Sequence, residues 1–126
     1  MMLSDPTLRV WLYQRPTDMR KSFRGLIALV KQQLHEDPLS GQLFVFINRR
    51  KTYIKVLYYS QGGFCLWMKK LTQGQFALNE HGRLKQALSW HELQWLIEGI
   101  EIQQARYRKR YTLARLEAQS GLQSSL

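Results

Sequence analysis

The spacing of hydrophobic and polar residues predicts the first elements of the chain. Leu8–Tyr13 is rich in β-forming residues and is predicted to be a strand. Apolar residues then recur at helical spacing over Met19–Leu34, which predicts an amphipathic helix with Thr17 or Asp18 as its N-cap. The turn-forming residues of Asp37–Gly41 are expected to end this helix.

The middle of the chain has the pattern of strands. Leu43–Ile47 is apolar at every position, as in a strand that is covered on both faces. Tyr53–Tyr59 and Phe64–Met68 are predicted to pair as a hairpin, because Ser60–Gly63 between them is a strong turn sequence. A short further strand is expected at Gln75–Leu78.

A second, short helix is predicted near the C-terminus. Ser89 and Glu92 have the spacing of a capping box, apolar residues follow on one face, and Gly99 stands where a C-terminal glycine would. The sequence therefore predicts an α+β fold: an antiparallel sheet of about four to five strands, with an amphipathic helix between the first two strands and a short C-terminal helix. We expect a single domain over residues 1–102 and a basic tail, partly helical or loose, over residues 103–126.

The net charge of the chain indicates that this small domain binds a polyanionic partner. The 126 residues contain 19 Lys and Arg against 9 Asp and Glu, for a formal net charge of +10. The excess is concentrated in residues 9–31, 49–70 and 102–126, and these stretches are separated by weakly acidic ones. Such segregation favours a surface for nucleic acid, on which Lys and Arg neutralise phosphates.

Aromatic residues lie among the basic ones, which fits contact with nucleic acid better than binding to a membrane. No cofactor and no membrane partner are predicted. The residues predicted to contact nucleic acid are Arg20, Lys21, Arg24, Arg49, Arg50, Lys51, Lys55, Lys69, Lys70, Arg106, Arg108 and Arg110.

Catalytic and metal-binding patterns are not found in the sequence. It has no phosphate-binding glycine loop, no nucleophile elbow, no helical histidine pair and no cysteine pair, so we predict no catalytic residue and no metal ligand. A weaker alternative is a metal-dependent nuclease that uses Asp18 and Asp37. Cys65 is the one cysteine, and no apolar run is long enough to span a membrane, which predicts a cytoplasmic protein.

A different alternative is a subunit that binds protein rather than DNA. The second helix combines acidic and tryptophan residues, which suits a docking surface. The residues predicted for such docking are Trp90, Trp95 and Glu98.

Several segments resemble one family of mobile-element proteins. They read TDMRKSFRGL at residues 17–26, DPLSGQLFVFINRR at 37–50, IKVLYY at 54–59, GFCLWMKKL at 63–71 and LQWLIEGI at 93–100. In order and spacing these resemble the TnpB accessory protein of the IS-sixty-six group of bacterial insertion sequences, over about residues 8–102. The chain departs from the family pattern at Ser60-Gln61, where Asp-Gly is common, and at Arg24, where an acidic residue is common.

The resemblance implies a protein that assists a separate, larger transposase. Our leading hypothesis is thus a non-enzymatic accessory factor of DNA transposition that binds nucleic acid through its basic surface. The implied partners are DNA, at the ends of the element, together with the transposase and other accessory proteins of the same element; a homo-oligomer is also possible. A subunit that docks the transposase without touching DNA is the alternative.

Overall fold

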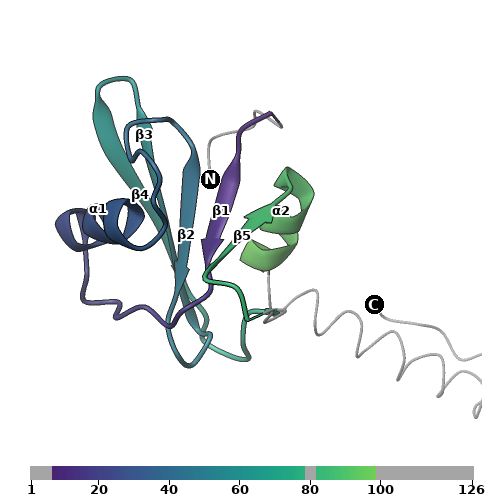
Figure 1. The fold of residues 1–126 in the computed structure, drawn as a ribbon. Helices are drawn as coiled ribbons and strands as arrows, with labels where there is room; N and C mark the ends of the chain where they lie inside the picture. Colours follow the sequence, from purple (N-terminus) through teal and green to yellow (C-terminus); the bar gives the residue numbers. More distant parts are fainter. Residues whose placement is uncertain (1–6, 79–81, 99–126) are drawn as a thin grey trace, which may run out of the picture.

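The computed structural model of the chain describes residues 7–78 and 82–98, which form a five-stranded sheet with one helix on each face (Figure 1). The α+β fold predicted from the sequence is confirmed. The elements in chain order are β1 (Val10–Tyr13), α1 (Phe23–Gln32), β2 (Leu43–Ile47), β3 (Tyr53–Ser60), β4 (Gly63–Lys70), β5 (Lys85–Leu88) and α2 (Trp90–Glu98). The predicted boundary at residue 102 lies outside the described residues.

The order of the strands is β4-β3-β2-β1-β5. Every neighbouring pair is antiparallel except β1 and β2, which are parallel. The parallel pair follows from the connection between these strands, because a chain that crosses back through a helix returns in the same direction. As a result β1 and β2 both finish at the same end of the sheet.

Apolar side chains cover both faces of the sheet, and β2 is buried at all five positions, as its sequence predicts. On one face Phe44, Phe46 and Leu57 pack with Leu26 and Val30 of α1.

The opposite face packs against α2. There Val45 and Val56 of the sheet lie in one cluster with Leu93, Leu96 and Ile97 of the helix. The capping box predicted for α2 is present, because the Ser89 amide donates to Glu92 Oε1 at 2.9 Å and the Glu92 amide donates to Ser89 Oγ at 3.0 Å. The predicted role of Gly99 lies outside the described residues.

Two lysines from the sheet anchor the ends of the segment that contains α1. Lys55 is only 5% exposed, and its ammonium donates to the carbonyls of Met19 at 2.8 Å and Lys21 at 2.7 Å, just before the helix. Just after the helix, the ammonium of Lys85 donates to the Leu34 carbonyl at 3.0 Å and forms an ion pair with Glu36.

The other helix has a similar contact at its C-terminal end. The ammonium of Lys69 on β4 donates to the carbonyl of Ile97 at 3.0 Å, where the orphan carbonyls of a helix favour a cation. We call Lys55, Lys69 and Lys85 the anchoring lysines. Each takes its position from a different strand, so the sheet fixes both helices through polar as well as apolar contacts.

The start of α1 differs from the sequence prediction. The helix begins at Phe23 rather than Met19, and its N-cap is Ser22 rather than Thr17 or Asp18. The reason is that the Asp18 carboxylate accepts a hydrogen bond from the Arg20 amide at 2.9 Å and so forms a turn of its own ahead of the helix.

The strand predicted at Gln75–Leu78 is wrong, and the fifth strand lies at β5 instead. The amide of Phe76 donates to the Lys51 carbonyl at 2.6 Å, and the buried ring of Phe76 fills the cluster beneath α2, but no ladder of hydrogen bonds forms. The sequence of β5, Lys-Gln-Ala-Leu, has little strand propensity. It becomes a strand because it pairs with β1, a tertiary contact that overrides local preference.

The turn between β3 and β4 forms at Ser60–Gly63, as the sequence predicts. Gln61 and Gly62 have φ values of 50° and 82°, and Ser60 pairs with Gly63 across the turn. Two central residues with positive φ are typical of the turn that matches the twist of a hairpin.

We expect Lys55→Met to lower the free energy of unfolding by about 1–3 kcal/mol, because it keeps the aliphatic stem but leaves the Met19 and Lys21 carbonyls without the donor that they have in the fold. Urea unfolding measures the change. Lys31→Met is the matched control, since Lys31 is exposed on α1. Equal stability of the two variants would show that the Lys55 bonds do not stabilise the fold.

Candidate nucleic-acid interface

The end of the sheet where β1 and β2 finish gathers segments that are far apart in the sequence. The Thr17 amide donates to the Ile47 carbonyl at 2.9 Å, which joins the chain after β1 to the β2–β3 loop. The Leu71 amide donates to the Thr52 carbonyl at 2.7 Å, and this bond adds the chain after β4. The segment before β5 joins them through the Gln14 amide, 2.8 Å from the Leu84 carbonyl.

Among the described residues, these segments and the adjoining end of β4 carry nine basic side chains and a single carboxylate, that of Asp18. We call this surface the basic end. Its basic residues are Arg15, Arg20, Lys21, Arg49, Arg50, Lys51, Lys69, Lys70 and Arg83. Seven of them belong to the set that the sequence predicts for nucleic-acid contact.

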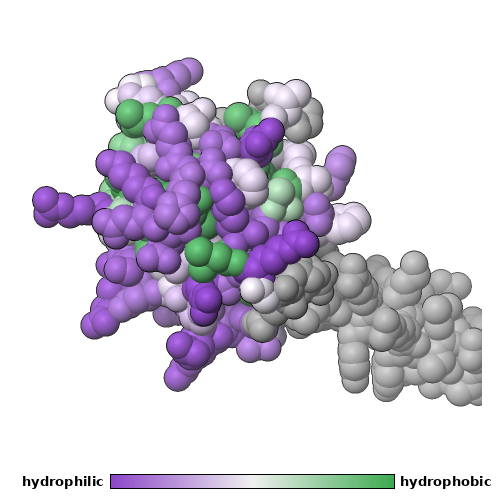
Figure 2. Space-filling model, in the orientation of Figure 1, coloured by the Kyte–Doolittle hydropathy of each residue, from purple (hydrophilic) through white to green (hydrophobic). Residues whose placement is uncertain are grey.

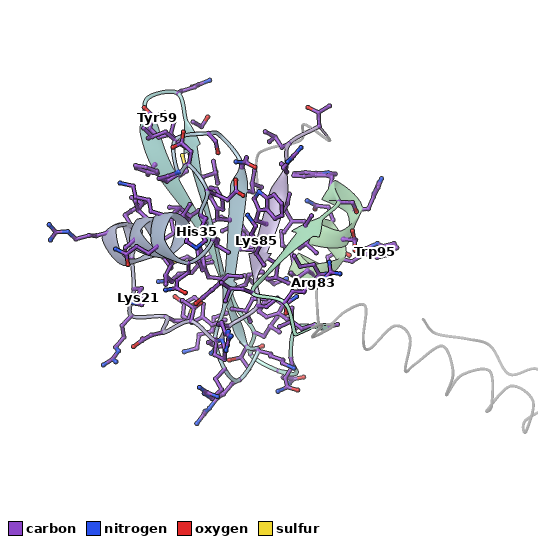
Figure 3. All side chains as sticks on the ribbon, in the orientation of Figure 1. Lys21, His35, Tyr59, Arg83, Lys85 and Trp95 are labelled. Carbon is purple, nitrogen blue, oxygen red and sulfur yellow. The ribbon has the colours of Figure 1, made fainter. Side chains whose placement is uncertain are left out.

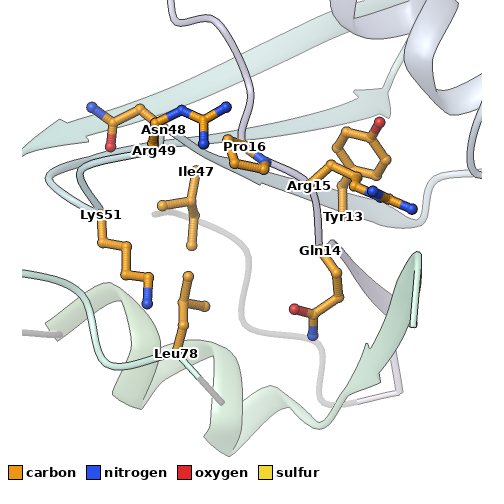
Figure 4. A pocket seen from close by; sticks show the side chains of 9 residues that line it. All are labelled: Tyr13, Gln14, Arg15, Pro16, Ile47, Asn48, Arg49, Lys51 and Leu78. Atoms are coloured by element: carbon orange, nitrogen blue, oxygen red, sulfur yellow. The ribbon is translucent and has the colours of Figure 1, made fainter. Parts of the chain in front are cut away.

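A recess opens in the middle of the basic end (Figure 4). Arg15 and Arg49 lie on either side of Pro16 along its rim, and Ile47 forms part of its floor. An adjoining recess shares Arg15, Arg49 and Pro16 and extends to Arg83. Among the described residues that line either recess there is no carboxylate, and the charged side chains are all cations.

The β2–β3 loop that carries Arg49 and Arg50 is held firmly by its own hydrogen bonds. The side-chain oxygen of Asn48 accepts from the amides of Thr52 at 2.9 Å and Tyr53 at 3.1 Å. From outside the loop, the Gln75 side-chain amide donates to the Arg50 carbonyl at 2.8 Å. The loop thus presents two exposed guanidinium groups from a fixed backbone.

The Arg15, Arg49, Arg50 and Arg83 guanidinium groups form no ion pair with another residue in the described ranges, in contrast to Arg20. The guanidinium of Arg20 binds the Asp18 carboxylate at 2.6–3.1 Å. Its hydrogen bonds, with the added donation from its amide, lower the pKa of Asp18 from 3.8 to about 2.

The ion pair of Arg20 with Asp18 is relevant to the hypothesis of a metal-dependent nuclease, which would use Asp18 and Asp37. Asp18 is engaged by a guanidinium, and Asp37 accepts a hydrogen bond from the Leu39 amide at 2.9 Å within its own turn. Within residues 7–78 and 82–98, no three His, Cys, Asp or Glu side chains come together as a metal site. The geometry of these two carboxylates therefore gives the nuclease hypothesis no support.

The remaining predicted contacts divide between the surface and the interior. Lys21 and Lys70 are exposed at the basic end. Arg24 is exposed on the outer stripe of α1, about two helical turns from Lys31. Lys55, by contrast, is buried. The expectation that it meets phosphate directly is revised, because its ammonium is already bonded to two carbonyls.

Lys69 is half-buried and is likewise committed to the Ile97 carbonyl. The predicted tail contacts, Arg106, Arg108 and Arg110, lie outside the described residues. Arg15 and Arg83 were missed by the sequence analysis. Arg15 precedes a proline at the end of a predicted strand, and this position could have indicated an exposed loop arginine. No local sequence feature indicates that Arg83 lies near Arg49.

The residues predicted for protein docking have different environments on α2. Trp90 is partly buried against the core cluster of that face, whereas Trp95 is 56% exposed and Glu98 is exposed. Figure 3 shows Trp95 on the far side of the sheet from Lys21, and the face seen in Figure 2 is mostly hydrophilic with small apolar patches. No helix in the described part of the chain is long and apolar enough to cross a membrane.

Comparison with known proteins assigns the chain to a family. Residues 8–107 match the family described as IS66 Orf2 like protein. An uncharacterized protein of Sinorhizobium fredii, y4hO, is 36% identical over 101 residues, which cover 80% of this chain and 88% of that protein. Another from the same organism, y4jC, is 36% identical over 69 residues, covering 55% and 59% of the two chains. No solved structure matches.

We expect the Asp18 carboxyl to titrate near pH 2 and to return toward its ordinary pKa of 3.8 in Arg20→Ala. Carbon-detected NMR of the carboxyl group measures both values. Because the folded-state pKa is depressed, the stabilisation by this pair is present above pH 3.8 and is lost as the pH falls through about 2. Arg24→Ala is the control, and an Asp18 pKa unchanged by Arg20→Ala would contradict the assignment.

Proposed function

The chain belongs to the IS66 Orf2 like family, whose role in transposition is accessory, and on this premise we propose that it binds DNA and assists a separate transposase. The basic end is the proposed DNA-binding surface. The observation that carries the proposal is the convergence of Arg15, Arg49 and Arg83 around adjoining recesses whose described lining holds no carboxylate.

The contacts proposed are with phosphates rather than with base edges in the major groove. Guanidinium groups bind phosphate oxygens through two parallel hydrogen bonds, and exposed arginines on fixed loops keep this geometry at low entropic cost. Phosphate contacts fix position and register but carry little sequence information. The proposed role is therefore to hold DNA for the transposase.

The set of proposed contacts is changed from the one that the sequence predicts. Lys55 and Lys69 are left out because both ammonium groups are bonded to helix carbonyls. Arg20 is a weaker candidate for phosphate contact because the Asp18 carboxylate neutralises its guanidinium. Arg24 is left out because it lies on the outer stripe of α1 and not at the basic end. Arg15 and Arg83 are added, and Lys21, Arg49, Arg50, Lys51 and Lys70 are kept. The tail residues Arg106, Arg108 and Arg110 stay in the proposal on their charge alone.

A second candidate function is docking of the transposase through α2. It is favoured by the exposure of Trp95, because Leu93, Leu96 and Ile97 already supply the contacts that α2 makes with the core. Large exposed aromatic residues are enriched where proteins bind one another. The basic end and this surface lie on different parts of the molecule, so one chain has room for both roles.

We expect the protein to bind duplex DNA with an affinity that falls steeply as salt rises, and Arg49→Ala with Arg83→Ala to weaken this binding. Each lost phosphate contact lowers the slope of log affinity against log salt by about 0.9. Gel-shift titrations over a salt series, on element-end and random duplexes, measure both quantities.

Arg24→Ala with Lys31→Ala is the matched control for that experiment, since it removes the same charge from the outer stripe of α1. If both double variants lose affinity equally, the basic end is not the binding surface. Binding by the wild-type protein that is independent of salt would contradict the proposed function itself.

For the second candidate, we expect Trp95→Ala to reduce capture of the element's transposase from nuclease-treated lysate and to leave DNA binding intact. Loss of an aromatic anchor at the centre of an interface costs about 2 kcal/mol or more. His91→Ala, exposed on the same helix, is the control. Equal capture by wild type and Trp95→Ala would remove this surface from consideration.

A further inference from the structure

A third recess lies beside the basic end, on the face of the sheet that α1 covers. It is lined by Trp11, Arg83, Lys85, Gln86 and Ala87. Arg83 also lines the neighbouring recess of the basic end, so the two are continuous along the surface. In Figure 3 Arg83 and Lys85 lie near each other, on the β5 side of the sheet. We call this surface the Trp11 recess.

The indole of Trp11 is held in place and surrounded by cations. Its Nε1 donates to the Gln42 side-chain oxygen at 2.7 Å, which fixes the ring at the edge of the core. The Lys85 ammonium lies 4.4 Å from the ring centroid and the Arg9 guanidinium lies 6.0 Å from it. The ammonium is held in turn by Glu36, so the ring and its nearest cation form one rigid unit.

The recess exists because a small residue stands beside the large one. Ala87 of β5 pairs directly with Trp11 of β1, and its methyl group leaves the neighbourhood of the indole uncovered at this edge of the sheet. The Trp11 side chain is half-buried, so part of its surface faces solvent. A larger residue at position 87 would fill this space.

We propose that the Trp11 recess binds an unpaired base of single-stranded DNA whose phosphates continue onto the basic end. Every base has a π-face that stacks on an aromatic ring, and such stacking is independent of sequence. Lys85 is already paired with Glu36, whereas Arg83 lines both recesses and forms no ion pair in the described ranges, so its guanidinium is placed to bind a phosphate beside the base. A base within an intact duplex is already stacked on both sides, so the recess selects unpaired DNA.

This inference rests on the proposed function, and it adds a class of substrate to it. The basic end by itself does not distinguish single strands from duplex, since both carry phosphates. The Trp11 recess supplies the distinction. DNA with melted ends would engage both surfaces at once.

The test compares an oligothymidylate of about sixteen nucleotides, which forms no duplex and is long enough for several stacking and phosphate contacts, with a blunt duplex of equal length. We expect Ala87→Leu to weaken binding of the oligothymidylate about ten-fold, as loss of one stacked base does, and to leave duplex affinity unchanged. Ala87 is exposed on an edge strand, where leucine is compatible with the fold. His91→Leu, on the opposite side of the sheet, is the matched control.

Trp11→Phe provides an independent readout. Stacking of a base on an indole quenches its fluorescence, so we expect oligothymidylate to quench the wild-type protein and this quenching to diminish in Trp11→Phe, although Trp67, Trp90 and Trp95 remain. If Ala87→Leu and His91→Leu bind oligothymidylate equally well, the inference is wrong. If the wild-type protein binds duplex but not oligothymidylate, the inference alone fails; if it binds neither, the proposed function fails as well.

Discussion

Hydrogen bonds from three lysine ammonium groups, of which Lys55 is buried and Lys69 and Lys85 are half-buried, hold both helices on this sheet. An ammonium removed from water requires hydrogen-bond acceptors, and the carbonyls at the ends of helices or beside them have free lone pairs. The ammonium groups of Lys55, Lys69 and Lys85 donate to such carbonyls, so donors and acceptors are satisfied together. The position of α1 over the sheet, and with it the path of the chain that forms the basic end, depends on these contacts.

The basic residues of the protein include some that stabilise the fold, such as the anchoring lysines, and others that are exposed on its surface. Part of the formal charge of +10 lies in the interior or against a carboxylate, where it stabilises structure. Another part, that of Arg15, Arg49, Arg50 and Arg83, is exposed on loops at one end of the sheet. A count of basic residues in the sequence cannot separate these kinds, because the difference depends on which carbonyl or carboxylate each cation meets after folding.

Most of the fold could be predicted from the sequence, and the misses have physical causes. The wholly apolar β2, the hairpin and the capping box of α2 are local signals, and each was found. β5 was missed because its pairing with β1 is a tertiary contact between residues about 75 positions apart. For the same reason the sequence identified the loop arginines Arg49 and Arg50 but missed Arg83, which reaches them only once β5 has paired.

The basic end is built from connections rather than from the strands themselves. Its arginines at positions 15, 49, 50 and 83 are exposed and make no contribution to either core cluster. Substitutions there alter the charge of the surface while the sheet and its two helices stay intact. Under the proposed function, a few substitutions in these loops would change the affinity for DNA and its dependence on salt without altering the fold.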